Sequence, residues 1–168
     1  MGTTASVCFI KNDKLFVSWI GDSRVYRYSR HGRVHALPYH FNNLEILSED
    51  HSKVWQMMVH GEISLEEART HEQSNIITQS LGDLFRTPRP ESREYPLFQD
   101  DFILICSDGL NGMLSDESIE KIISSEKDSP EKIAENMVIE ANIAGGHDNI
   151  TLILIKIIEG IRLMRARL

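Results

Sequence analysis

The chain has 168 residues, 41% of them hydrophobic, which is typical of one globular domain and not of a disordered chain. Its formal net charge of −7 argues against nucleic acid as a partner, because binding phosphates needs a clustered basic surface. No apolar stretch reaches the ~20 residues that span a bilayer, so no membrane partner is predicted either.

The cysteines and the first residues indicate a compartment. Cys8 and Cys106 lack metal-type spacing, and each lies in an apolar run where a small hydrophobic residue is expected. Residues 1–4 carry neither the charged region nor the long apolar region of a secretory signal. The sequence therefore predicts a reduced, cytoplasmic protein.

The first forty residues have the pattern of a β-meander. Strands are predicted at residues 3–10, 15–20, 25–29 and 34–37, with tight turns at 11–14 and 30–33. After residues 44–51, two short helices are predicted at 52–59 and 65–70, as a mobile surface insertion. Strands at 76–81 and 93–98 follow, joined by a loop that contains two prolines.

The second half alternates apolar strands with helices. A strand over 102–107 precedes a helix that Ser115 caps, and a second helix begins at Ser129 and Pro130 and stops at 145–146. Residues 149–158 are almost all apolar and β-branched, which predicts a central strand covered on both faces. Residues 159–168 form a basic tail that we expect to be frayed.

Three carboxylates stand next to apolar strands. Asp108 follows the run 102–107, Asp148 precedes 149–155, and Asp22 follows 15–20. A charge at the mouth of a buried strand is costly to desolvate, and a bound cation offsets that cost. Oxygen ligands suit Mg or Mn, whereas zinc would call for cysteine or histidine at ligand spacing. The sequence thus predicts a divalent-metal site.

Serine catalysis is the main alternative chemistry. Ser23 and Ser107 each stand beside an acidic residue, but neither lies in a Gly-x-Ser-x-Gly elbow and neither has a convincing histidine partner. A single aspartate at a strand end is also more often a turn former or helix cap than a ligand. The metal reading therefore depends on the joint occurrence of the three carboxylates.

Six segments together resemble the PPM-type (type 2C) metal-dependent protein Ser/Thr phosphatases. The segments are Gly2-Thr3-Thr4-Ala5, Gly21-Asp22-Ser23-Arg24, Leu47 to Ser52, Ile77 to Gly82, Cys106-Ser107-Asp108-Gly109-Leu110 and Gly146 to Thr151. One such motif is weak, but six in the family's order make a chance resemblance improbable. Residues 52–75 further resemble the flap of bacterial members.

The resemblance implies an α+β fold, a sandwich of two antiparallel β-sheets flanked by helices. It implies hydrolysis of phosphoserine and phosphothreonine in protein substrates by metal-activated water, with Mn or Mg as cofactor and no side chain as nucleophile. Asp108 and Asp148 would bind one core metal, and Asp22 with Asp108 a third. We expect supporting roles for Gly109, for Asn149 beside Asp148, and for Arg24 as an ion-pair partner rather than a substrate clamp.

The chain also departs from the family pattern. Members begin with a phosphate-clamping arginine and an Asp-Gly-x-Gly-Gly motif that bridges the core metals, and neither occurs in these 168 residues. Residues 1–158 are therefore expected to be an incomplete phosphatase domain, lacking the N-terminal part, with weak metal binding. Unpaired sheet edges would favour a dimer or domain swap. The alternative function is a non-catalytic fragment or pseudophosphatase that acts as a binding module.

Overall fold

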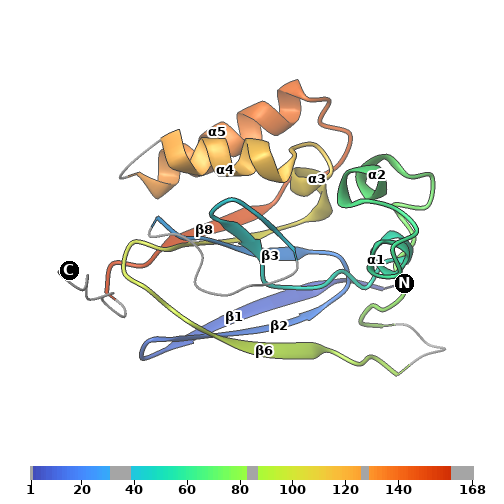
Figure 1. Ribbon diagram of the computed structural model, residues 1–168, viewed down its shortest axis with the longest axis horizontal. Helices are drawn as coiled ribbons and strands as arrows, with labels where there is room; N and C mark the ends of the chain where they lie inside the picture. The colour runs from blue at the N-terminus through green and yellow to red at the C-terminus, as the bar shows by residue number, and fades with distance from the viewer. Residues whose placement is uncertain (1, 31–38, 83–86, 126–128, 160–168) are drawn as a thin grey trace.

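Two antiparallel β-sheets stacked face to face form the centre of the computed structural model, which describes residues 2–30, 39–82, 87–125 and 129–159 (Figure 1). Helices cover the outer face of the larger sheet and one end of the sandwich. The predicted α+β sandwich is confirmed. No helix in the described ranges is long and apolar enough to cross a membrane.

The small sheet has the strand order β1 (Ala5–Lys11), β2 (Lys14–Ile20), β6 (Glu91–Pro96). The predicted first hairpin is present: Lys11 pairs with Lys14, and Asn12 between them has the positive φ (54°) that a two-residue hairpin turn demands. Along β2, alternate residues Leu15, Val17 and Trp19 are buried. This period of two places one face of the sheet against the large sheet.

The large sheet has the order β4 (His40–Phe41), β5 (Leu44–Ile46), β3 (Arg24–Tyr28), β7 (Phe102–Cys106), β8 (Leu152–Lys156). β3 is buried along its whole length because it lies between β5 and β7 and has other elements on both faces. β3 begins, and β7 ends, at the same end of the sandwich, since Arg24 pairs with Cys106.

Three helices, α3 (Asp108–Asn111), α4 (Asp116–Ser125) and α5 (Pro130–Ile143), lie on the outer face of the large sheet, and α1 (Lys53–Val59) and α2 (Leu65–Thr70) lie at its end (Figure 1). The Ser129 side chain accepts from the backbone of Lys132 and Pro130 takes the first position, as predicted for α5. The sequence did not indicate the four-residue α3.

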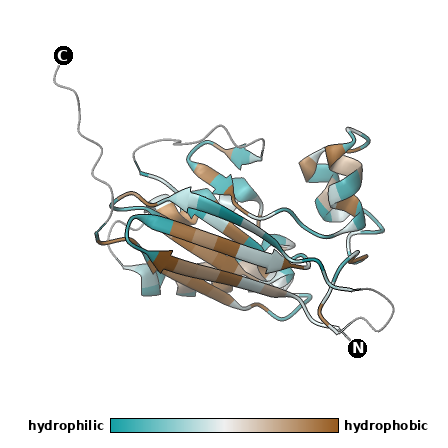
Figure 2. Ribbon diagram, turned by 90° about the horizontal axis from the view of Figure 1, so that it is seen from below, coloured by the Kyte–Doolittle hydropathy of each residue, from teal (hydrophilic) through white to brown (hydrophobic). Residues whose placement is uncertain are grey.

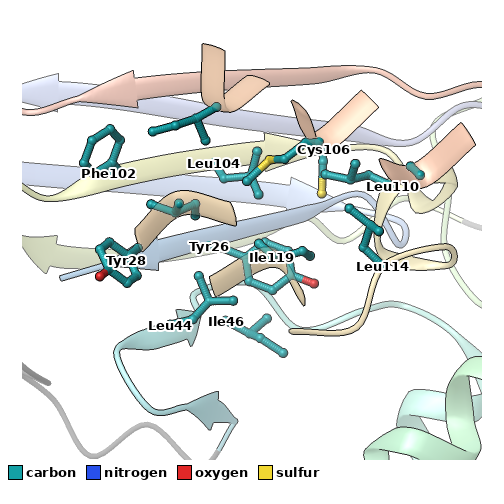
Figure 3. Packing of buried hydrophobic residues seen from close by; sticks show 14 of the residues in the cluster. Tyr26, Tyr28, Leu44, Ile46, Phe102, Leu104, Cys106, Leu110, Leu114 and Ile119 are labelled. Atoms are coloured by element: carbon teal, nitrogen blue, oxygen red, sulfur yellow. The ribbon is translucent and has the colours of Figure 1, made fainter. Parts of the chain in front are cut away.

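Side chains on the two faces of the large sheet form two separate apolar clusters. The helix-side core gathers Tyr26, Leu104 and Ile119 with their neighbours under α4 and α5 (Figure 3). The inter-sheet core contains Val17, Trp19, Ile103 and other residues between the sheets. Trp55 of α1 belongs to the helix-side core, so this part of the predicted surface insertion is anchored in the interior.

Two predicted strands differ from the structure, and a third lies outside the described residues. Residues 76–81 make only the isolated bridges Ser52–Ile77 and Thr3–Leu81, because their apolar side chains are exposed and no face of the segment packs on a core. Residues 149–158 form the shorter β8, and within the described sheet it is an edge strand instead of a central one. Residues 34–37 lie in a range that is not described.

One buried ion pair of the large sheet lies in the inter-sheet layer. The Arg27 guanidinium is paired with the Glu45 carboxylate on the neighbouring strand β5, and both side chains are fully buried. Arg27 also donates to the carbonyl of Pro96 (3.0 Å), at the end of β6 in the opposite sheet. Because each charge is desolvated, each depends on its partner, and the bond to Pro96 connects the pair to the small sheet.

Replacing one member of this pair should destabilise the protein far more than replacing both. We expect Arg27→Met or Glu45→Leu alone to lower the free energy of unfolding by about 3–5 kcal/mol, since each leaves an uncompensated buried charge. The double variant should recover most of that loss in urea unfolding. Single variants within ~0.5 kcal/mol of the parent chain would contradict this.

Candidate active site

The three predicted carboxylates meet at one end of the sandwich. Asp22, Asp108 and Asp148 line a single cavity of about 290 Å³, together with Arg24 and Gly109. They come from the segment after β2, the segment after β7 and the loop before β8. Residues more than a hundred positions apart in the sequence are therefore brought together by the pairing of β3 with β7 and of β7 with β8.

Asp22 is held by a turn that is tied to residue 51. Gly21 has φ of 102°, and a Cβ there would stand 2.3 Å from the Thr4 side chain, so only glycine fits. Its amide donates to His51 Nδ1 (3.1 Å), and the His51 amide donates to the Gly21 carbonyl (2.9 Å). Burial, then the charge of Asp108, then that of Asp50 raise the pKa of Asp22 to about 6.

Asp108 is the first residue of α3. Its Oδ1 accepts from the amide of Gly109 (3.0 Å), which turns the carboxylate back over the helix start. Burial and, after it, the charge of Asp148 raise the pKa of Asp108 above its ordinary range. The charge of Asp108 therefore makes Asp22 harder to ionise, and the charge of Asp148 makes Asp108 harder to ionise. A bound cation would relieve both repulsions.

The loop before β8 packs directly on the start of α3. A Cβ on Gly109 would stand 2.4 Å from the Asn149 carbonyl oxygen, so the absent side chain allows the contact. The Ser107 hydroxyl donates to that same carbonyl (3.0 Å) and accepts from the Thr151 amide (3.0 Å). The Asn149 amide in turn donates to Asp148 Oδ1 (2.6 Å). Ser107 therefore has a structural use in joining the two segments that carry carboxylates.

Arg24 forms the floor of the cavity. Its Nε and Nη2 donate to the Asp50 carboxylate (2.9 and 2.7 Å), and Nη1 donates to the Tyr26 hydroxyl (3.2 Å). Its guanidinium also lies over the Trp55 ring, 5.5 Å from the centroid. The expectation that Arg24 pairs with carboxylates is confirmed, and its donors are committed to the protein interior.

Sequence reasoning missed three other residues that line the cavity: Asp50, Arg69 and His147. Asp50 lies in the motif Leu47 to Ser52, but only the fold shows that its partner is Arg24. Arg69 of α2 donates from Nε and Nη2 to the carbonyls of Asn111 and Gly112 (3.3 and 3.4 Å), and so attaches the flap to the end of α3. No local sequence signal indicated this contact.

The carboxylates at this cavity are the kind of ligand that binds a hard divalent cation, but they do not form a complete set of ligands. Among the described residues, no group of three or more Asp, Glu, His or Cys side chains is placed to hold a metal ion. Carboxylate oxygens are the ligands that Mg and Mn prefer. The described residues therefore supply part of such a site.

Substituting Gly109 tests the packing between α3 and the loop before β8. In Gly109→Ala the new methyl group would meet backbone atoms of Asn149, which cannot rotate away. We expect a loss of about 1–3 kcal/mol in urea unfolding. Gly2→Ala is the control, since its nearest contact at 2.6 Å is the rotatable Ser80 hydroxyl. Equal stability of the two variants would show that the contact is not restrictive.

Removing the Asp22 charge should stabilise the metal-free protein. Because folding raises the Asp22 pKa from 3.8 to about 6, the folded state binds the proton more tightly, and stability falls as pH rises through that interval. In chelator, Asp22→Asn should therefore melt at a higher temperature than the parent chain near neutral pH, and the difference should vanish below about pH 4. A lower melting temperature near neutral pH would contradict the argument.

The chain is similar to bacterial protein phosphatases in sequence. It is 37% identical over 159 residues to protein phosphatase PhpP of Streptococcus pneumoniae, covering 95% of this chain and 59% of the relative. It is 33% identical over 156 residues to serine/threonine phosphatase stp of Listeria monocytogenes, covering 93% of this chain and 57% of the relative. The chain thus spans less than two thirds of the length of these relatives. No protein-family model matches it.

The fold is similar to that of solved bacterial phosphatases. The catalytic domain of the serine/threonine protein phosphatase PstP in complex with two manganese ions superimposes with a TM-score of 0.73 at 26% identity. The match covers 94% of this chain and 60% of that domain. Sequence and fold therefore agree over nearly all of residues 1–168, and at least one relative is a metal-bound enzyme.

Proposed function

This chain belongs to the bacterial PPM-type protein phosphatases, and we propose that it provides the larger part of a metal-dependent protein serine/threonine phosphatase. The observation that carries the proposal is the convergence of Asp22, Asp108 and Asp148 on one cavity. The three acids come from separate strand ends, and two of them have pKa values raised in part by a neighbouring acid's charge. Carboxylates that converge in this way are suited to binding a cation.

We assign the ligand roles by residue. Asp108 and Asp148 would hold one core metal, and Asp22 with Asp108 a further one, with Mn or Mg as the ion. When bound, these ions supply a water of lowered pKa and neutralise phosphoryl charge. Gly109 and Asn149 support the ligands, because their contact sets the position of the loop that carries Asp148 relative to Asp108.

The substrate class comes from the relatives, which are named a protein phosphatase and a serine/threonine phosphatase. We propose that a phosphorylated serine or threonine side chain of a protein binds at this cavity, where Arg69 adds a positive charge. Arg24 would not grip the phosphate, since Asp50 and Tyr26 take its donors. We further propose a cytoplasmic signalling role, in keeping with two free cysteines.

A non-catalytic binding module is the second candidate function. It is favoured by the lack, among the described residues, of three side chains placed to hold one metal ion. In that case the acidic cavity and the flap over residues 52–75 would bind a partner without turnover. The two candidates differ in a single measurable property, which is hydrolysis.

Mn-dependent hydrolysis of a phosphothreonine peptide tests the proposal. We expect turnover that chelator removes and that Asp108→Asn lowers at least ~100-fold in kcat/KM, because the variant loses a carboxylate ligand while keeping its shape. Asp13→Asn, in the exposed turn between β1 and β2, is the matched control and should keep full activity. Mn-dependent turnover that survives Asp108→Asn would refute the assigned site. No turnover by residues 1–168, either alone or mixed with the part of PhpP that they do not span, would favour the binding module.

A further inference from the structure

A second cavity, of about 240 Å³, adjoins the one that the three carboxylates line. Asp50 and Trp55 line both cavities, so the two share a wall. The other walls of the second cavity include residues of α1, of the motif Leu47 to Ser52, and Glu91 at the start of β6. β6 is the hydrophilic edge strand of the small sheet, in contrast to β1 (Figure 2). The proposed metal chemistry leaves this second cavity without a role.

The second cavity has a wall with more negative than positive charge. Glu49 and Glu91 line it, and Nη2 of Arg93 lies 2.6 Å from Glu49 Oε1 and 3.8 Å from Glu91 Oε2. Asp50 lines it too, but the Arg24 guanidinium neutralises that carboxylate (2.7 Å). Among the described residues that line this cavity there is no lysine or arginine. Glu49 and Glu91 therefore share one cation, and a second cation would balance them.

His51 orders this wall without adding charge. Its Nδ1 accepts from the Gly21 amide (3.1 Å), so the ring proton is on Nε2, 3.2 Å from Glu91 Oε1. A proton on Nδ1 as well would break the bond to Gly21. A neutral donor therefore holds the Glu91 carboxylate beside the cavity, and the same ring reaches the turn that carries Asp22.

Trp55 in the shared wall has an unused hydrogen-bond donor. Its indole N–H has no partner among the described residues, although the side chain is only 5% exposed. Buried donors are nearly always paired, as the indole of Trp19 is with the Glu49 carbonyl (2.7 Å). The Trp55 ring is held between the Arg24 guanidinium, 5.5 Å from its centroid, and the Tyr39 ring, at 4.6 Å. A ligand that brings a carbonyl oxygen to this wall would satisfy the donor.

We propose that the second cavity binds an arginine residue of the substrate protein, close in sequence to the phosphorylated serine or threonine. The planar guanidinium presents its donors in a fork that can reach both Glu49 and Glu91. A main-chain carbonyl of the same peptide would accept from the Trp55 indole. The shared wall puts the two cavities side by side, and an extended peptide advances about 3.3 Å per residue, so a few residues span both.

The link to substrate rests on the proposed phosphatase function, whereas the binding of an arginine peptide does not. A metal ion is a poorer occupant, because the described residues form no group of three or more ligands and Arg93 already occupies Glu49. An anion would be repelled by Glu49 and Glu91. A simple amine would supply the charge but no carbonyl for Trp55.

Titration with short unphosphorylated peptides in metal-free buffer tests the site apart from catalysis. Isotope-labelled residues 1–168 would receive N-acetyl-Ala-Arg-Ala-amide or the same peptide with citrulline, which keeps the shape of arginine and removes its charge. We expect a Kd of about 1 mM or tighter for the arginine peptide and binding at least about fivefold weaker for the citrulline peptide. In nuclear magnetic resonance spectra the Trp55 indole proton should move downfield as it gains an acceptor. The indole proton of Trp19, which is already bonded, should stay in place.

Two matched variants locate the contact. Glu91→Gln should weaken binding of the arginine peptide about fivefold or more, because it removes a charged acceptor and keeps the shape. Glu94→Gln is the control, since it lies on the same strand, pairs with Lys14 and is not among the residues that line the cavity. The two side chains are equally accessible, at 45% exposed for Glu91 and 47% for Glu94.

Four outcomes would overturn the proposal. They are equal binding of the arginine and citrulline peptides, equal weakening by the two variants, an unmoved Trp55 indole proton up to about 10 mM arginine peptide, and equal affinity for the amine agmatine, which lacks a carbonyl.

Mn-dependent hydrolysis separates this proposal from the phosphatase function. A phosphothreonine peptide with arginine three positions away should have a kcat/KM about fivefold above that of its citrulline counterpart, and Glu91→Gln should remove the difference. Turnover with no such difference would refute the arginine site and leave the phosphatase function intact. Selective binding of the arginine peptide without turnover would refute the phosphatase function and leave the arginine site intact.

Discussion

The buried ion pair between Arg24 and Asp50 is the contact on which the site depends. It joins the start of β3 to the segment before α1, and through Arg24 it reaches the Trp55 ring and the Tyr26 hydroxyl. Tyr26 extends the network by donating to Asp116 at the start of α4 (3.2 Å). Breaking a pair of this kind leaves an uncompensated buried charge, so the floor of the cavity is fixed in one geometry.

This pairing also determines which charges stay uncompensated. The Arg24 charge lowers the Asp22 pKa, but burial and the charges of Asp108 and Asp50 each raise it by more. The protein thus keeps acidic groups close together at a cost to its own stability, as functional sites commonly do. A bound cation would remove the repulsion between these acids, and the free energy recovered in this way would strengthen the binding of the cation.

The sequence by itself determined the local elements and the identity of the chemical groups. Apolar period and capping residues predicted β2, β7 and α5, because these signals act between residues close in the chain. The family motifs marked Asp22, Asp108 and Asp148. Only the tertiary structure decided that Arg24 pairs with Asp50, that Arg69 attaches the flap to α3, and that β8 is an edge within the described sheet. Each of these depends on which distant segments lie side by side, and no local pattern encodes that.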